Sequence, residues 1–182
     1  MILETPRLYL RGLEQSDLQD LKEILQDPQV VYAYEHTFSD ADVQHWLDRQ
    51  RRHYKSEGFG LWEAIRKDTG EMVGQAGLTM QPYDGKQVLE VGYLLKKRFW
   101  HQGYAREAAA GCMHYAFAHL HASRVHAIIK ADNTPSMAVA KALGMTKQAE
   151  FITRYYAGDM LHFLLSTTCD PLSQQSIQEV LP

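Results

Sequence analysis

One stretch of this chain constrains its fold most: a strand pattern that leads through a loop with one glycine into an alanine-rich helix. Residues 88–95, VLEVGYLL, predict a strand, and residues 104–119 place small apolar residues at helical spacing. Gly103 stands directly before that helix. A helix N-terminus offers free N–H groups and the positive end of the helix dipole, so this unit can hold an anion. A glycine in this place is also typical of a plain tight turn.

The rest of the chain alternates strand and helix patterns. Helices are predicted from Ser16, where Ser16 and Gln19 form a capping-box pattern, from Ser39, over 104–119, and from Pro135. Strands are predicted over residues 8–11, 59–66, 72–80, 88–95, 125–131, 148–156 and 160–168.

This order predicts a single α/β (α+β) domain over residues 1–168, followed by a C-terminal tail, 169–182. Its mixed central sheet has about six or seven strands and is flanked by about four helices.

Composition narrows the class of protein. The 182 residues suffice for one domain with its own core, and the net charge of −3 provides no basic field for a nucleic-acid partner. The two cysteines, Cys112 and Cys169, form no CxxC pair, so a reducing compartment is expected. We find no signal-peptide pattern, and no apolar run approaches the ~20 residues of a membrane span. We therefore expect a cytoplasmic protein that does not enter a membrane.

Two common phosphate-binding loops are excluded. The chain contains no GxxxxGK[ST], which rules out a Walker-type nucleotide loop. No GxGxxG follows the first strand, which disfavours a dinucleotide-binding fold.

The segment VLEVGYLLKKRFWHQGYAREAA resembles the acyl-CoA-binding motif of the GNAT superfamily of N-acetyltransferases. The family loop has the pattern [QR]xxGx[GA], and here its positions are Trp100, Gly103 and Ala105. The Trp departs from the general pattern but is similar to the RimJ/RimL ribosomal-protein branch, where W-x-x-G-Y-A is usual. ETPRLYLRGLEQSDLQDL and NTPSMAVAKALGM resemble two further segments of that branch, so the likeness covers roughly residues 2 to 168.

The resemblance implies acetyl-CoA as co-substrate, with no metal. It assigns the coenzyme's pyrophosphate to the amides of the loop and first helical turn: His101, Gln102, Gly103, Tyr104, Ala105 and Arg106. It assigns pantetheine to the backbone of Tyr93, Leu94 and Leu95, beside a splay between the fourth and fifth strands. Asn133 would contact the cofactor, or is simply a turn or capping residue. Arg98 or Lys97 could neutralise phosphate charge, or belong to a solvated basic stretch.

Acetyl transfer to an amine needs a base and an oxyanion donor. Glu90, on a strand flanked by apolar residues, is the candidate base, and the alternative is a buried structural carboxylate bonded to a neighbouring strand or helix. The expected oxyanion donor is a backbone N–H near Leu94, with Gly92 marking either a bulge that frees it or close packing.

A proton donor to the leaving thiolate is the third requirement. Many family members place a tyrosine seven residues after the asparagine, but that position is Ala140 here. Ser136 is the candidate acid that this branch offers, and the alternative is a helix-start serine bonded to its own backbone.

The nine histidines show no zinc spacing, so we expect no metal. The four that cluster in sequence, His114, His119, His121 and His126, are interpreted as helix-face and loop residues. Tyr155, Tyr156 and Asp159 resemble the region that lines the acceptor pocket, or face solvent on the last hairpin.

These features predict direct attack by an amine in a ternary complex, with neither cysteine as nucleophile. The acceptor is a protein N-terminus, as in the ribosomal branch, or a small amine. The alternative is a catalytically silent coenzyme A binding or sensing module. A homodimer is a family-level expectation.

Overall fold

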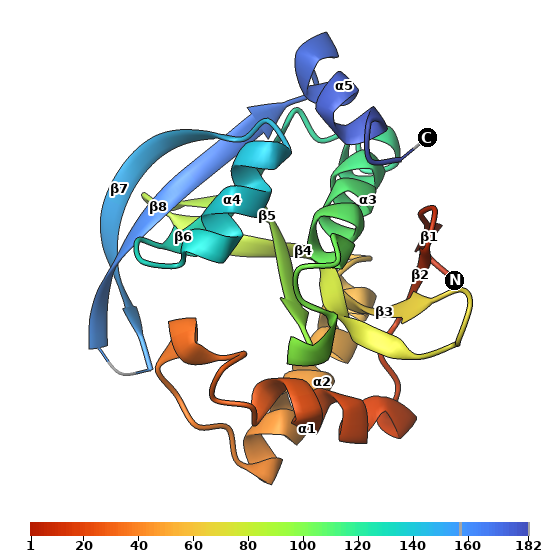
Figure 1. The fold of residues 1–182 in the computed structure, drawn as a ribbon. Coiled ribbons are helices and arrows are strands. Elements are labelled where there is room, and N and C mark those ends of the chain that lie inside the picture. Colours follow the sequence, from red (N-terminus) through yellow and green to blue (C-terminus); the bar gives the residue numbers. More distant parts are fainter. Residues whose placement is uncertain (157, 182) are drawn as a thin grey trace.

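The computed structural model describes residues 1–156 and 158–181, without the side chains of residues 155 and 171–174 (Figure 1). Its strands are β1 (Leu3–Glu4), β2 (Leu8–Arg11), β3 (Leu61–Arg66), β4 (Met72–Tyr83), β5 (Lys86–Leu95), β6 (Arg124–Lys130), β7 (Thr146–Tyr155) and β8 (Gly158–Thr168). Its α-helices are α1 (Leu18–Leu25), α2 (Asp40–Ser56), α3 (Tyr104–Ala118), α4 (Thr134–Ala142) and α5 (Pro171–Gln178). No described helix is both long and apolar enough to cross a bilayer.

The strands form one mixed sheet in the order β1-β2-β3-β4-β5-β6-β8-β7. The β5–β6 pair is parallel, and the other neighbouring pairs are antiparallel. The predicted mixed α/β fold is confirmed, although the described residues form eight strands rather than six or seven. The additional strand, β1, has two residues, too few for any alternation to show in the sequence.

The sheet is covered on both faces. One core cluster lies between the sheet and α3 and includes Leu8, Val91 and Met113. A second cluster packs α1 and α2 against the opposite face through Leu21, Leu47 and others. Alternate residues of β5 contribute to the two clusters, since successive side chains of a strand point to opposite faces.

Local sequence signals place most helix ends. Ser39 caps α2 and forms a capping box with Asp42, and Pro135 lies in the first turn of α4. The capping box predicted at Ser16 is wrong, because Glu14 and Asp17 form it two residues earlier, around a short 3₁₀ turn.

The segment predicted as a C-terminal tail contains helix α5. Ile177 of this helix is fully buried and belongs to the core cluster beside α3. The helix is short and has no charged residue in its first or last turn, so neither helix dipole nor periodicity marks it in the sequence.

A pair of facing glycines provides a test of how tightly β3 and β4 approach. Gly77 lies opposite Gly92 in the register, but only a Cβ at Gly77 would collide with backbone, 2.0 Å from the Gly60 oxygen. A Cβ at Gly92 would meet the Leu61 side chain at 3.6 Å, an ordinary contact. Gly77→Ala should therefore lower the free energy of unfolding by about 2–3 kcal/mol.

The matched control is Gly92→Ala, which should stay within about 0.5 kcal/mol of the wild type. Urea unfolding of both variants measures the difference. Equal losses in the two variants would contradict the close approach at Gly77.

Candidate active site

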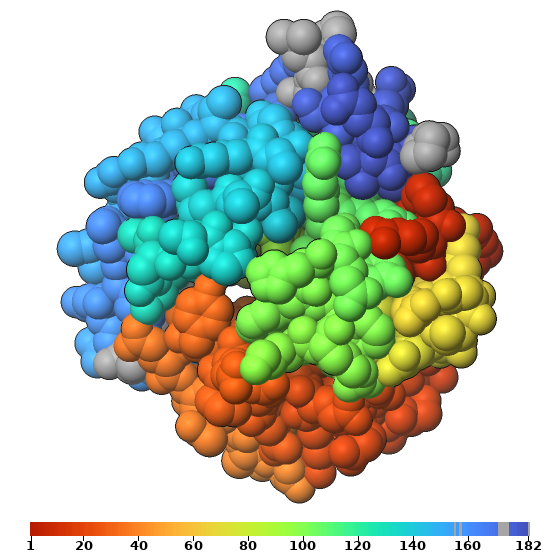
Figure 2. Space-filling model, in the orientation of Figure 1, coloured from red at the N-terminus to blue at the C-terminus, as the bar shows by residue number. Residues whose placement is uncertain are grey.

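Strands β5 and β6 separate immediately beyond Glu90. They pair in register at Glu90 and His126, and beyond that point β5 continues to Leu95 paired with β4 alone. The pairing therefore leaves an opening in the middle of the sheet, between the C-terminal halves of two parallel strands. This confirms the predicted splay, and the space-filling view is hollowed where the segment before α2, the start of α4 and the loop before α3 meet (Figure 2).

The ladder with β4 decides which backbone groups of β5 face the opening. The Lys96 N–H donates to the Val73 carbonyl at 2.9 Å, and the register then runs without a shift. In an antiparallel ladder every second residue of a strand bonds to the same neighbour. Leu94, two residues before Lys96, therefore also directs its N–H toward β4. Tyr93 and Leu95 present their polar groups to the other side, where the opening lies.

Two expectations change as a result. No bulge occurs at Gly92, so the interpretation in which a bulge frees the Leu94 N–H is wrong. The backbone positions available at the opening are those of Tyr93 and Leu95 rather than Leu94. The Leu95 carbonyl already accepts a hydrogen bond from the Trp100 indole at 3.0 Å, which ties the following loop to the strand.

The loop before α3 presents a row of free amides. Gly103 is the N-cap with φ of 83°, a left-handed conformation that favours glycine, and no side chain caps the helix. The N–H groups of residues 101–106 donate to no described residue. Six amides at the positive end of a helix dipole can hold an anion, and their assignment to a diphosphate stays a prediction.

Arg7, from the N-terminal segment, contacts both this loop and the first turn of α3. Its Nε donates to Glu107 Oε2 at 2.6 Å, its Nη1 donates to the Gln102 carbonyl at 3.0 Å, and its guanidinium lies 4.3 Å from the centre of the Tyr104 ring. Glu107 is buried and also accepts from the Thr5 hydroxyl at 2.7 Å. The pairing neutralises a carboxylate that would otherwise repel an anion at this helix start.

The basic residues of the loop differ in what they contact. Arg98 forms ion pairs with Glu23 at 3.0 Å and Glu71 at 2.7 Å, so its charge is already balanced by two carboxylates. Arg106 has no ion pair with a described residue, and its buried Nε has no hydrogen-bond partner among them. Lys97 is exposed. Arg106 and Lys97 are therefore the basic residues in and beside this loop that have no ion pair with a described residue.

Glu90 occupies the point where the strands part. Its Oε1 accepts from the Ile128 N–H of β6 at 3.1 Å, and its Oε2 accepts from the Thr79 hydroxyl of β4 at 3.3 Å. Burial raises the pKa of this carboxyl to about 7, and the two hydrogen bonds act in the opposite direction. Glu90 thus bonds to a neighbouring strand, as the structural interpretation expects, and a pKa raised to about 7 also suits a general base at neutral pH.

His126 lies beside Glu90 on β6, as the strand predicted over residues 125–131 requires, and not on a helix face or loop as the interpretation of the histidines has it. Its Nδ1 is 3.2 Å from the Leu89 carbonyl, so Nδ1 carries the hydrogen in the neutral ring. Burial lowers the pKa of His126. Among the described residues no group of histidine, cysteine or acidic side chains is arranged to hold a metal ion.

The first turn of α4 carries two predicted site residues. Asn133 is the N-cap, and its Oδ1 accepts from the Ser136 N–H at 3.2 Å. The hydroxyl of Ser136 bonds to no described residue, so it is not the self-bonded helix-start serine of the alternative interpretation. Ala140 is buried in the core, which leaves no room for a phenol at the usual position.

Tyr93 reaches across the opening to the same helix. Its hydroxyl donates to the Ser136 carbonyl at 3.3 Å, and burial raises its pKa above the ordinary range. The side chain therefore joins β5 to α4 on the face that α3 and α4 cover.

Aromatic side chains cover the opposite face. Tyr34, His36 and Phe38 precede α2, and they contact Trp46 of α2 and Tyr156 of the β7–β8 turn. His36 stacks on Tyr156 with ring centres 4.1 Å apart. Tyr156 therefore belongs to this aromatic cluster, and its role in an acceptor pocket stays a prediction. The side chain of Tyr155 lies outside the described part of the chain.

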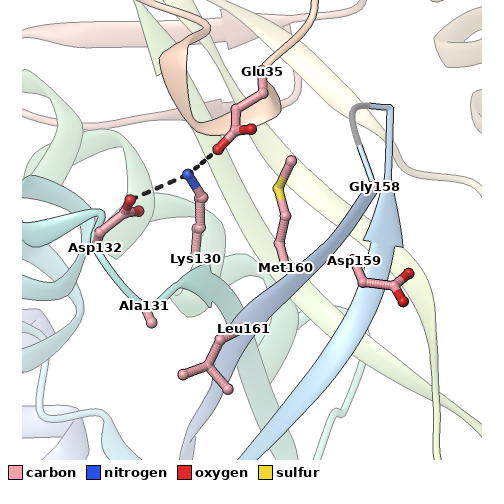
Figure 3. Close-up of a pocket in the computed structure, with 8 residues that line it drawn as sticks. All are labelled: Glu35, Lys130, Ala131, Asp132, Gly158, Asp159, Met160 and Leu161. Atoms are coloured by element: carbon pink, nitrogen blue, oxygen red, sulfur yellow. Dashed lines mark hydrogen bonds and ion pairs between the residues drawn. The ribbon is translucent and has the colours of Figure 1, made fainter.

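A cavity of about 370 Å³ opens beside this aromatic cluster (Figure 3). Lys130 lies between Glu35 at 2.5 Å and Asp132 at 3.2 Å, Met160 points toward them, and Asp159 points away. The carboxylates of Glu35 and Asp132 around the single Lys130 give the lining an excess of negative charge.

Sequence reasoning missed three residues of this site. Arg7 and Glu107 support the loop across one hundred residues of chain, and Tyr32 contacts Asn133. Arg7 lies in the segment ETPRLYLRGL, whose resemblance to a family signature was the available signal. Tyr32 lies in a segment with no recognisable motif.

A model of one protein family matches most of this chain. The family model described as "Acetyltransferase (GNAT) domain" matches residues 7–146. A protein of Bacillus subtilis (strain 168), described as uncharacterized protein YkkB, is 35% identical over 144 residues, which are 79% of this chain and 84% of that protein.

Solved structures share the fold at lower identity. The acetyltransferase (GNAT family) from Bacillus anthracis matches with a TM-score of 0.77 and 23% identity, over 92% of this chain and 98% of that one. The ribosomal-protein-S5-alanine acetyltransferase from Vibrio fischeri matches with a TM-score of 0.74 and 18% identity, over 92% of this chain and 96% of that one.

Proposed function

Since the chain belongs to the GNAT acetyltransferase family, we propose that it transfers an acetyl group from acetyl-CoA to a primary amine by direct attack in a ternary complex. One observation carries the proposal: the opening between β5 and β6 lies between the free amides of residues 101–106 and the carboxylate of Glu90. A donor held by the amides can reach through the opening toward a base.

The diphosphate of the donor binds the amides of the loop and the first turn of α3. Gly103 lets the diphosphate approach the backbone, and Arg106 supplies the unpaired positive charge. The pantetheine arm lies along β5 in the place that β6 leaves empty. It bonds to the N–H groups of Tyr93 and Leu95 and to the carbonyl of Tyr93, which have no ladder partner on β6. Asn133 contacts this arm from α4.

Glu90 accepts the proton of the attacking amine, directly or through one water. An ammonium has no lone pair, so the proton must leave before the nitrogen can attack the thioester carbonyl. A carboxyl with a pKa of about 7 is partly ionised at neutral pH and can both take this proton and release it. The bond from the Ile128 N–H holds the carboxylate at the opening.

The carbonyl oxygen becomes an oxyanion as the carbon–nitrogen bond forms, and a backbone N–H of Tyr93 or Leu95 stabilises it. The tetrahedral intermediate collapses with loss of the coenzyme A thiolate. The free hydroxyl of Ser136 donates a hydrogen bond to that thiolate, in the absence of a tyrosine at Ala140. Cys112 is fully buried and burial raises its pKa, so it forms no acyl-enzyme.

The acceptor is a protein N-terminus or a small amine. The RimJ/RimL-like motifs and the fold shared with a ribosomal-protein-S5-alanine acetyltransferase support the first. The cavity near Lys130 and Glu35 is of a size that suits either.

The function is tested by incubating the protein with acetyl-CoA and a panel of peptide N-termini, amino acids and polyamines, with thiol release as readout. At least one amine should raise the rate well above the hydrolysis measured without acceptor. Binding of coenzyme A without transfer to any amine would instead support the silent binding module.

The loop is tested by Gly103→Val. A β-branched residue resists φ near 83° and fills the space at the backbone, so the affinity for coenzyme A should fall below detection in calorimetry. The control is Gly85→Val, because Gly85 has a similar φ of 70° and lies in the remote β4–β5 turn. Gly103→Val that binds like the wild type would overturn the assignment of the loop.

Glu90→Gln tests the base. The amide oxygen can still accept from the Ile128 N–H, and the NH₂ can donate to the Thr79 hydroxyl oxygen, but the amide accepts no proton. The value of kcat should therefore fall by about 10²–10⁴-fold with little change in coenzyme A affinity. Only the ionised carboxylate acts as base, so the wild-type rate should decline as the pH falls below about 7. That acidic limb should be missing from the variant. An unchanged rate and pH profile, in a variant whose melting temperature is retained, would leave Glu90 a purely structural carboxylate.

A further inference from the structure

A tyrosine from outside every recognised motif contacts the candidate donor site. Tyr32 lies in the 3₁₀ turn Tyr32–Tyr34 between α1 and α2, and its hydroxyl donates to Asn133 Oδ1 at 2.7 Å. The two residues are 101 positions apart in the chain. The side chain of Tyr32 is 40% exposed, so apolar burial alone does not account for its place. Its hydrogen bond to Asn133 is the contact that joins Tyr32 to the opposite side of the opening.

This contact fixes the orientation of the Asn133 amide. Oδ1 accepts from two donors, the Tyr32 hydroxyl and the Ser136 N–H, which uses both lone pairs of that oxygen. The amide NH₂ group of Asn133 has no hydrogen-bond partner among the described residues. An amide rotated by 180° would place its NH₂ against the Ser136 N–H, which can only donate, so the NH₂ stays on the free side, and the Tyr32 hydroxyl holds Oδ1 in this orientation.

The same segment is fastened a second time. Glu35, three positions after Tyr32, forms an ion pair with Lys130 of β6 at 2.5 Å (Figure 3). Two contacts thus join the segment between α1 and α2 to the end of β6 and the start of α4. Together with the loop before α3, these segments surround the hollow seen in the space-filling view (Figure 2).

We infer that Tyr32 is a positioning residue of the donor site, holding the Asn133 amide so that its NH₂ donates to a carbonyl of the bound pantetheine arm. Pantetheine contains two amide carbonyls, and a side-chain amide N–H is a suitable donor to such an oxygen. Burial raises the pKa of Tyr32, so its hydroxyl remains a donor throughout the neutral range. The inference rests on the proposed function, because it requires a coenzyme A donor in the opening.

Calorimetry with coenzyme A alone, without acceptor, measures the effect in four proteins: the wild type, Tyr32→Phe, Asn133→Ala and the double variant. Tyr32→Phe should weaken binding by about 3- to 10-fold, the range of one neutral hydrogen bond. Because Tyr32 acts through Asn133, the double variant should bind no more weakly than Asn133→Ala. Tyr83→Phe, the same change on β4 away from the opening, should bind like the wild type.

A shortened donor distinguishes the arm from the diphosphate. The loss in Tyr32→Phe should persist when KM is measured with acetyl-pantetheine, which lacks the diphosphate. Wild-type affinity in Tyr32→Phe, or losses that add in the double variant, would overturn the inference while leaving the proposed function intact. A wild type that gives no binding heat with coenzyme A would overturn both.

Discussion

The single register pair between Glu90 and His126 is the constraint on which the rest of this structure depends. Two parallel strands that part after one pair leave backbone N–H and C=O groups without a ladder, and such groups need partners. Glu90 supplies one, since its carboxylate accepts the Ile128 N–H beyond the last pair. The Trp100 indole supplies another for the Leu95 carbonyl. What remains open is a short polar edge that suits an extended, amide-containing ligand.

Electrostatics make the other end of the opening suitable for an anion. The helix dipole and the free amides of the loop already favour negative charge, but Glu107 in the first turn of α3 opposes it. Arg7 cancels that charge and at the same time holds the Gln102 carbonyl. One ion pair between the N-terminal segment and α3 therefore determines both the shape and the potential of the loop. Arg106, which has no ion pair with a described residue, then adds a positive charge to the first turn of the helix.

Different contacts hold the opening on the two faces of the sheet. Tyr93 ties β5 to α4 on one face, and on the other the segment before α2 closes over the end of β6 through Tyr32 and Glu35. Asn133 at the start of α4 is thereby held by two contacts, one with the Ser136 N–H of its own helix and one with Tyr32 across the opening. Because the aromatic cluster around His36 and Tyr156 continues from the same segment, a movement of this segment would alter the opening and the aromatic cluster together.

The sequence by itself determined whatever depends on neighbours along the chain. Gly103 before an alanine-rich helix, the cap at Ser39 and the order of strands and helices follow from local conformational preferences, and Glu90 stands out as a carboxylate in an apolar strand. Only the tertiary structure decided the rest. The Leu94 amide turned toward β4 because of strand register, and the Arg7–Glu107 and Tyr32–Asn133 contacts join residues about one hundred positions apart. The choice of a distant partner leaves no periodic trace in a sequence, since it depends on which surfaces the folded chain brings together.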